Sequence, residues 1–71
     1  MNYFNSNLNF LKEKNQLSKV EIANKMGVTK QAMTKLFKSE NPQANTIIAI
    51  SEIFQVSIDD LLLKDLSKEE N

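Results

Sequence analysis

Hydrophobic residues recur along the whole chain at intervals of three and four positions, which is the spacing that buries one face of a helix. No segment alternates apolar and polar residues for long enough to predict a strand. The 71 residues include one glycine and one proline, so we expect the helices to be joined by short connections. The pattern therefore predicts an all-α fold of five short helices around one core.

The first helix is predicted to run from an N-cap at Ser6 to about Lys14. Leu8 and Leu11 would face the interior, since they lie three positions apart on one side of the helix. Aromatic side chains would cover one edge of this helix: Phe10, or Tyr3 and Phe4.

Local signals predict a second and a third helix in the centre of the chain. Ser18 begins the second helix, and Glu21 completes a capping box three residues later. Gly27 fits the left-handed position that ends a helix without a side-chain clash. Thr29 then caps a third helix that ends near Lys38.

Two helices joined by a turn of three to four residues containing glycine form the helix-turn-helix motif, here over residues 18–38. The small side chain of Ala23 would let the third helix pack closely across the second. Val28, in the turn, would fill the angle between the two helices.

The turn-forming segment 39–43 leads into a fourth helix predicted over about residues 44–54. Its buried face would consist of Ile47, Ile50, Ile53 and Phe54. Ser57, paired with Asp60, would cap a fifth helix that continues through residues 61–63. These elements predict one domain over residues 1–66, followed by a frayed acidic tail over residues 67–71.

The third helix has two contrasting faces. Its buried stripe would comprise Met33, Leu36 and Phe37, which leaves a polar face on the opposite side: Lys30, Gln31, Thr34, Lys35 and Lys38. This outer face carries long hydrogen-bonding side chains and no acid. Such groups read base edges in the DNA major groove, so the pattern favours a sequence-specific DNA-binding module.

Specific base contacts follow from the chemistry of these side chains. The amide of Gln31 can bond adenine, Lys30 and Lys35 can donate to guanine, and Thr34 can touch a thymine methyl group or a phosphate. We therefore predict that Lys30, Gln31, Thr34 and Lys35 read bases.

The distribution of charge supports an anionic partner although the formal net charge is +0. Residues 1–38 hold seven lysines and two glutamates, a net charge of +5, while residues 39–71 hold two lysines and seven acids, a net charge of −5. One face would then meet an anion while another turns away from it. The alternative is chance clustering of charge on a solvated surface.

Phosphate contacts are expected on both sides of the third helix. The start of the second helix, at Ser18 and Lys19, would present N–H groups and a cation to one phosphate. The polar segment from Lys38 to Gln43, which includes Asn41, would contact the backbone on the far side. Lys19 as an ordinary solvated lysine, and this segment as a plain connector, are the alternatives.

Composition argues against an enzyme. The chain has no histidine and no cysteine, which removes the usual general base, thiol nucleophiles and the commonest metal ligands. Asp59 and Asp60 are adjacent at a helix start and suit capping better than acid–base catalysis. We expect no cofactor, no metal and no small-molecule ligand. Lacking a membrane span, a secretory signal and disulfides, the chain fits a cytoplasmic setting.

The chain resembles the lambda-repressor-like helix-turn-helix family, of the Cro/repressor or XRE type, over residues 8–63. The matching features are Leu17-Ser18, Ile22-Ala23, Met26-Gly27-Val28-Thr29, Met33, Leu36 and the run Phe54-Gln55-Val56-Ser57-Ile58-Asp59-Asp60-Leu61-Leu62. The resemblance implies the same base-reading positions, and it implies that Ser18, Lys19 and Thr29 neighbour phosphates. It also implies a transcriptional regulator, and specifically a repressor, that binds a palindromic operator in double-stranded DNA as a homodimer. Members of the family often form such dimers through the C-terminal helix.

The chain departs from the family pattern at three places. Lys19 stands where the family often has Gln, and Phe37-Lys38-Ser39 replaces a frequent Glu-x-Gly. Gln55 replaces a usual glycine, so the turn before Val56 would need a left-handed glutamine.

A second function remains open from the sequence. The same fold could serve as an antitoxin or protein-interaction module, with DNA binding secondary. Its interface, or that of a homodimer, would use apolar residues near the C-terminus: Ile58, Leu62 and Leu63. Phe54 is a further candidate, but Phe54 and Leu62 both suit the core, so Leu63 is the best candidate for an interface.

Overall fold

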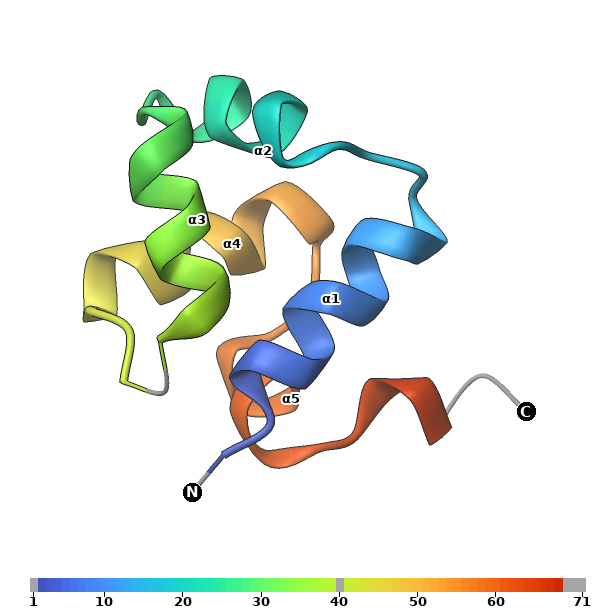
Figure 1. Cartoon of the computed structure of the whole chain (residues 1–71). Coiled ribbons are helices and arrows are strands. Elements are labelled where there is room, and N and C mark those ends of the chain that lie inside the picture. Colours follow the sequence, from blue (N-terminus) through green and yellow to red (C-terminus); the bar gives the residue numbers. More distant parts are fainter. Residues whose placement is uncertain (1, 40, 69–71) are drawn as a thin grey trace.

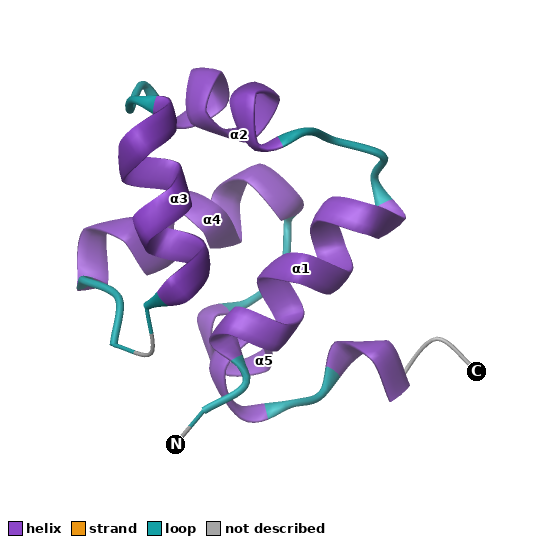
Figure 2. Cartoon of the chain, viewed as in Figure 1, coloured by secondary structure: helices purple, strands orange, loops and turns teal. Residues whose placement is uncertain are grey.

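The computed structural model describes residues 2–39 and 41–68, and all its regular elements are helical (Figures 1 and 2). The helices are α1 (Phe4–Lys14), α2 (Lys19–Met26), α3 (Lys30–Lys38), α4 (Ala44–Phe54) and α5 (Ile58–Leu63), followed by a 3₁₀ turn, η1 (Leu66–Lys68). The predicted all-α fold of five short helices is confirmed. Over the described residues, no helix has both the length and the apolar character needed to cross a membrane.

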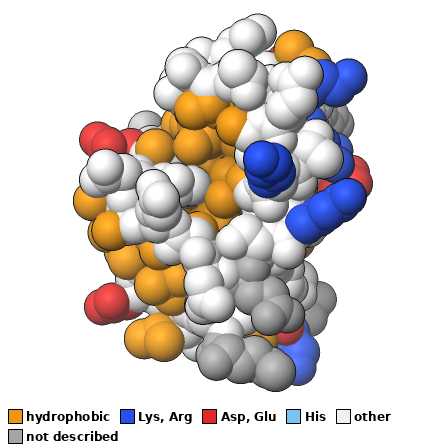
Figure 3. All heavy atoms as spheres, turned by 60° about the vertical axis from the view of Figure 1, so that its left-hand side comes forward, with side chains coloured by type: hydrophobic (Ala, Val, Ile, Leu, Met, Phe, Trp, Pro, Cys, Tyr) orange, Lys and Arg blue, Asp and Glu red, His pale blue; other side chains and the backbone are white. Residues whose placement is uncertain are grey.

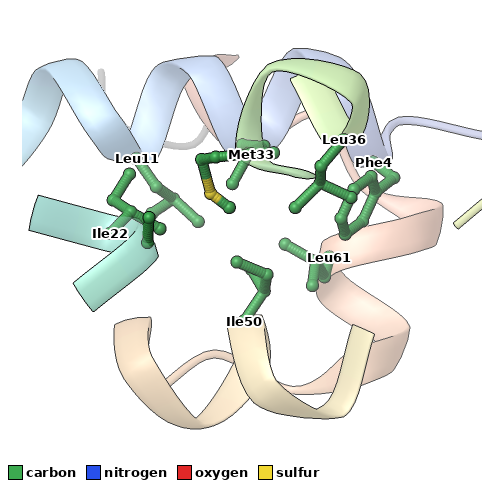
Figure 4. Packing of buried hydrophobic residues seen from close by; sticks show 9 residues of the cluster. Phe4, Leu11, Ile22, Met33, Leu36, Ile50 and Leu61 are labelled. Atoms are coloured by element: carbon green, nitrogen blue, oxygen red, sulfur yellow. The ribbon is translucent and has the colours of Figure 1, made fainter. Parts of the chain in front are cut away.

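One hydrophobic core joins all five helices. Side chains from α1, α2 and α3 converge from one side on Ile50 of α4 and Leu61 of α5 (Figure 4). The buried apolar residues are Phe4, Leu8, Leu11, Ile22, Ala23, Met33, Leu36, Ile50 and Leu61. Because each helix contributes to this single cluster, none of them can bury its apolar face alone.

The start of α1 differs from the prediction. The helix begins at Phe4 rather than after Ser6, and the N–H of Phe4 donates to Asn2 Oδ1 at 3.0 Å. Phe4 is fully buried instead of covering an edge. With Leu8 and Leu11 it forms a stripe at i, i+4 and i+7, so burial of the aromatic ring extends the helix through the predicted cap.

The buried face of α4 is narrower than predicted, and the C-terminal segment contains a short turn. Ile50 is the buried residue of α4, while Ile47, Ile53 and Phe54 are partly buried and Ile48 is exposed. A 3₁₀ turn, η1, spans Leu66–Lys68 and includes the first two residues of the predicted tail over residues 67–71. The remainder of the predicted tail, residues 69–71, lies outside the described residues, and the domain boundary at residue 66 stays a prediction.

A fully buried asparagine connects the two ends of the fold. Asn7 Nδ2 donates to the backbone oxygens of Leu61 and Lys64, each at 2.7 Å, and Asn7 Oδ1 accepts from the N–H of Leu66 at 2.9 Å. These bonds satisfy carbonyls at the end of α5 that have no partner within that short helix. The Asn7 side chain, which comes from α1, therefore caps the C-terminal end of α5 and binds the start of η1.

We expect Asn7→Leu, which keeps a similar volume, to lower the free energy of unfolding by about 2–3 kcal/mol, because it leaves buried backbone groups without partners. Urea unfolding followed by circular dichroism measures this change. Asn9→Ala is the matched control, since Asn9 is exposed and bonds only the oxygen of Asn5 among the described contacts. Equal stability of the two variants would contradict the role assigned to Asn7.

Candidate nucleic-acid interface

The predicted capping signals form the start of α2. Ser18 Oγ accepts from the N–H of Glu21 at 3.1 Å, and Glu21 Oε1 accepts from the N–H of Ser18 at 2.9 Å. This reciprocal capping box satisfies two backbone donors at the helix end. It fixes the direction in which α2 leaves the preceding turn.

The turn between α2 and α3 depends on a left-handed glycine. Gly27 has φ 72° and ψ 32°, a conformation that costs other residues steric strain. The N–H groups of Gly27 and Val28 donate to the oxygens of Asn24 and Ala23, which completes the end of α2. Thr29 Oγ1 then accepts from the N–H of Ala32 at 3.1 Å and begins α3.

The packing of α2 against α3 follows the prediction at one position and departs from it at another. Ala23 is 3% exposed, so its small side chain allows close contact between the helices. Val28 is 38% exposed and does not fill the angle between them as expected. Its position in a tight turn leaves part of the side chain outside the core.

The two predicted faces of α3 are present. Met33 and Leu36 are buried, and Phe37 packs partly against the core. The opposite side carries exposed Lys30, Gln31, Lys35 and Lys38. Lysine side chains gather on one side of the molecule, beside a hollow lined by apolar groups (Figure 3). The sequence of α3 contains no acid, so the outer face of this helix carries lysines and neutral polar side chains only.

Thr34 lies on the same face but is half-buried. Its hydroxyl donates to the oxygen of Lys30 at 3.1 Å, so the hydroxyl proton is used within the helix. The methyl group and an oxygen lone pair remain for other contacts. Thr34 is thus suited to an apolar contact or to accepting a hydrogen bond.

A cation–π contact flanks one edge of α3. Lys19 Nζ lies 5.1 Å from the centre of the Phe37 ring. Lys19 is half-buried, whereas Ser18 beside it is exposed. Two positions at which the chain departs from the family pattern therefore contact each other.

A groove of about 430 Å³ flanks the other edge of α3. Its lining includes the apolar side chains of Met33 and Leu36, together with Lys35, Ser39 and Asn41 from α3 and the segment that follows it. The side of α3 that carries the lysines is thus bordered by α2 on one edge and by the segment after Ser39 on the other.

The segment after α3 is tied to α1. Asn5 Nδ2 donates to the oxygen of Ser39, and Ser39 Oγ accepts from the N–H of Asn41 at 3.3 Å. Lys38 and Asn41, both predicted to contact phosphate, are exposed. The bond from Asn5 fixes the exit of α3 through a contact distant in sequence, which local sequence patterns do not reveal.

Among the described residues, two other than glycine have a left-handed backbone. Gln55 has φ 56° and ψ 45° at the end of α4, which confirms the expected left-handed glutamine. Gln16, with φ 55°, has the same handedness between α1 and α2. Nothing in the local sequence had indicated this second position.

The predicted interface residues near the C-terminus differ in how far they are exposed to solvent. Leu63 is 71% exposed and Ile58 is 40% exposed, whereas Leu62 packs partly against the core. Ile48 on α4 is also exposed at 44%. Ile48 was not among the predicted interface residues.

Comparison with models of protein families matches a helix-turn-helix family over residues 9–61. A crystal structure of a transcriptional regulator from Listeria innocua is similar to this chain, with a TM-score of 0.76 and 26% sequence identity. That similarity covers 99% of this chain and 72% of the other. No curated protein matches the chain.

The turn that orients α3 can be tested at Gly27. An added Cβ would meet no atom within 4 Å, so Gly27→Ala should cost only the backbone strain, about 1 kcal/mol of unfolding free energy. Gly27→Asn should cost less, since asparagine adopts the left-handed region more readily. Chemical unfolding of both variants measures the difference, and an alanine variant as stable as the parent would refute the argument.

Proposed function

The chain belongs to the XRE-type helix-turn-helix family, and on that premise we propose that it is a sequence-specific regulator of transcription that binds double-stranded DNA. It acts as a repressor, binds an inverted-repeat operator as a homodimer, and works by binding rather than by catalysis. The similarity to a transcriptional regulator of known structure supports the regulatory role.

One observation carries the proposal: the buried stripe of α3 leaves an exposed, acid-free face on that helix. A major groove about 12 Å wide accepts a helix that presents such side chains. In this role Gln31 bonds adenine, Lys30 and Lys35 donate to guanine, and Thr34 contacts a thymine methyl group. The methyl contact suits Thr34 because its hydroxyl proton is already used within the helix.

The two edges of α3 support contacts to the DNA backbone. Ser18, Lys19 and Thr29 would face one strand, where α2 and α3 begin, and Lys38 and Asn41 would face the other. Such contacts set the register of the protein on the duplex without reading sequence. Because they release counterions, affinity should fall steeply with salt concentration.

A homodimer through α5 is proposed from its exposed apolar residues. Leu63 and Ile58 would form the centre of the contact, and partly buried Leu62 its border. The molecule measures 32 × 24 × 19 Å, so two copies side by side can place their α3 helices about 34 Å apart, one turn of DNA. The operator would then be an inverted repeat with that spacing. A dimer bound there would prevent RNA polymerase from binding the same DNA.

Selection of binding sites from random duplex DNA, read by sequencing, tests the proposal as a whole. Enrichment of an inverted repeat with half-sites one turn apart is the expected result. No enrichment, together with no retention of any duplex at low salt, would overturn DNA binding and favour a module that binds another protein.

Gln31→Ala should reduce discrimination at one base position of each half-site by about 1–3 kcal/mol. Removing the amide eliminates a bidentate contact to adenine, so the loss should be confined to that position. Competition binding with single-base operator variants measures it. Asn9→Ala on α1 is the control, and an unchanged base preference for Gln31→Ala would contradict the role given to this residue.

Leu63→Glu should weaken the dimer by about tenfold or more, because a charge would replace an apolar group at the centre of the contact. Sedimentation equilibrium measures the change. Val20→Glu is the matched control, since Val20 is 46% exposed and lies on α2, far from α5 (Figure 1). A parent protein that stays monomeric both free and on DNA would refute the dimer.

A further inference from the structure

In the part of the chain that the structure describes, two lysines lie over aromatic rings. Lys19 Nζ is 5.1 Å from the centre of the Phe37 ring, and Lys14 Nζ is 5.9 Å from that of Phe10. Both distances lie within the range in which the ring quadrupole attracts a cation. The pairs differ in position, since Phe10 and Lys14 belong to one helix while Lys19 and Phe37 connect α2 to α3.

The position of Lys19 is unfavourable for the stability of α2 alone. Lys19 is the first residue of that helix, where a cation opposes the helix dipole and an acid would be favoured. Glu21, the acid of the first turn, is used in the capping box with Ser18. The contact with Phe37 offsets part of this unfavourable placement.

Phe37 also restricts where the Lys19 ammonium can go. A free lysine side chain samples many rotamers and loses this freedom when it binds a phosphate. Lys19 is half-buried, whereas the four lysines at positions 25, 30, 35 and 38 are exposed. The ring therefore holds a cation at the edge of the surface formed by the outer face of α3.

We propose that Phe37 is a positioning residue for DNA binding: its ring holds the Lys19 ammonium at the edge of α3, ready to contact a backbone phosphate. This inference rests on the proposed function and assigns a role to a residue that does not itself touch DNA. Because a phosphate contact carries no sequence information, the contribution of the pair is equal for operator and random DNA.

The test measures affinity for a random-sequence DNA duplex over a range of salt concentrations. Phe37→Leu should weaken binding about two- to fivefold, the size of a cation–π contribution at a partly exposed site. The salt dependence should stay unchanged because the charge is retained. Phe37→Tyr, which keeps the ring, should restore parental affinity.

Lys19→Met removes the charge while keeping a long apolar side chain. It should weaken binding and lower the slope of log affinity against log salt by about 0.9, the value for one lost phosphate contact. In the Lys19→Met background, Phe37→Leu should have no further effect. A purely structural role of Phe37 would not make its effect on binding depend on Lys19.

Phe10→Leu is the matched control, since it removes the ring of the other cation–π pair on α1. It should leave DNA affinity unchanged. Urea unfolding of every variant confirms that binding is measured on folded protein. Should Phe37→Leu unfold, Phe37→Met replaces it as a variant that fills the same space without a ring.

The proposal is overturned if Phe37→Leu binds as the parent does, if its effect persists in the Lys19→Met background, or if Phe10→Leu causes an equal loss. These outcomes concern variants of a protein that binds DNA. A parent that retains no duplex at low salt is a different result, and it refutes the proposed function together with this inference.

Discussion

Burial of the apolar stripe of α3 is the constraint on which the rest of the structure depends. Met33 is fully buried and Leu36 is 9% exposed, and both belong to the one core cluster to which every helix contributes (Figure 4). A helix has one rotational setting that buries such a stripe, so the opposite face must point outward. The same packing that stabilises the domain therefore orients its lysines and its glutamine.

A domain of this size needs interactions beyond its small core, and Asn7 supplies some of them. Chains this short bury a modest fraction of their surface and are marginally stable. Asn7 bonds backbone groups of α5 and η1 from within the core, while the N–H of Tyr3 donates to the oxygen of Leu62 at 2.9 Å. These bonds connect the N-terminal part of the chain to α5 and η1. The α2–turn–α3 unit takes no part in them.

The distribution of charged residues over the chain matters more for this protein than its net charge. The whole chain is formally neutral, yet α3 has no acid and Lys19 is held at its edge by Phe37. At the C-terminal end of α5, Lys64 Nζ lies 3.5 Å from Asp60 Oδ1, so a cation and an acid are neighbours there. A formally neutral protein can thus present one positive surface to an anionic partner while the compensating negative charge lies elsewhere on the chain.

The sequence by itself determined the features that act over a few residues. The capping box at Ser18, the left-handed Gly27, the caps at Thr29 and Ser57, and the stripe of α3 are all encoded within one or two helical turns. For this reason the helix-turn-helix and four of the five helix starts were predictable. The exposure of Lys30, Gln31 and Lys35 on α3 followed from the same periodicity, whereas Thr34 is half-buried, and the roles of these residues remain proposals.

Only the tertiary structure decided the features that join distant parts of the chain. Because Phe4 is buried, α1 begins before the cap predicted at Ser6. The hydrogen-bond partners of Asn7 lie more than 50 positions away in the sequence. Lys19 contacts Phe37 because α2 and α3 pack against each other. The same packing decides that Val28, in the turn between them, is partly exposed. Hydrophobic periodicity shows which face of a helix is buried, but the neighbours of each side chain depend on how the helices pack.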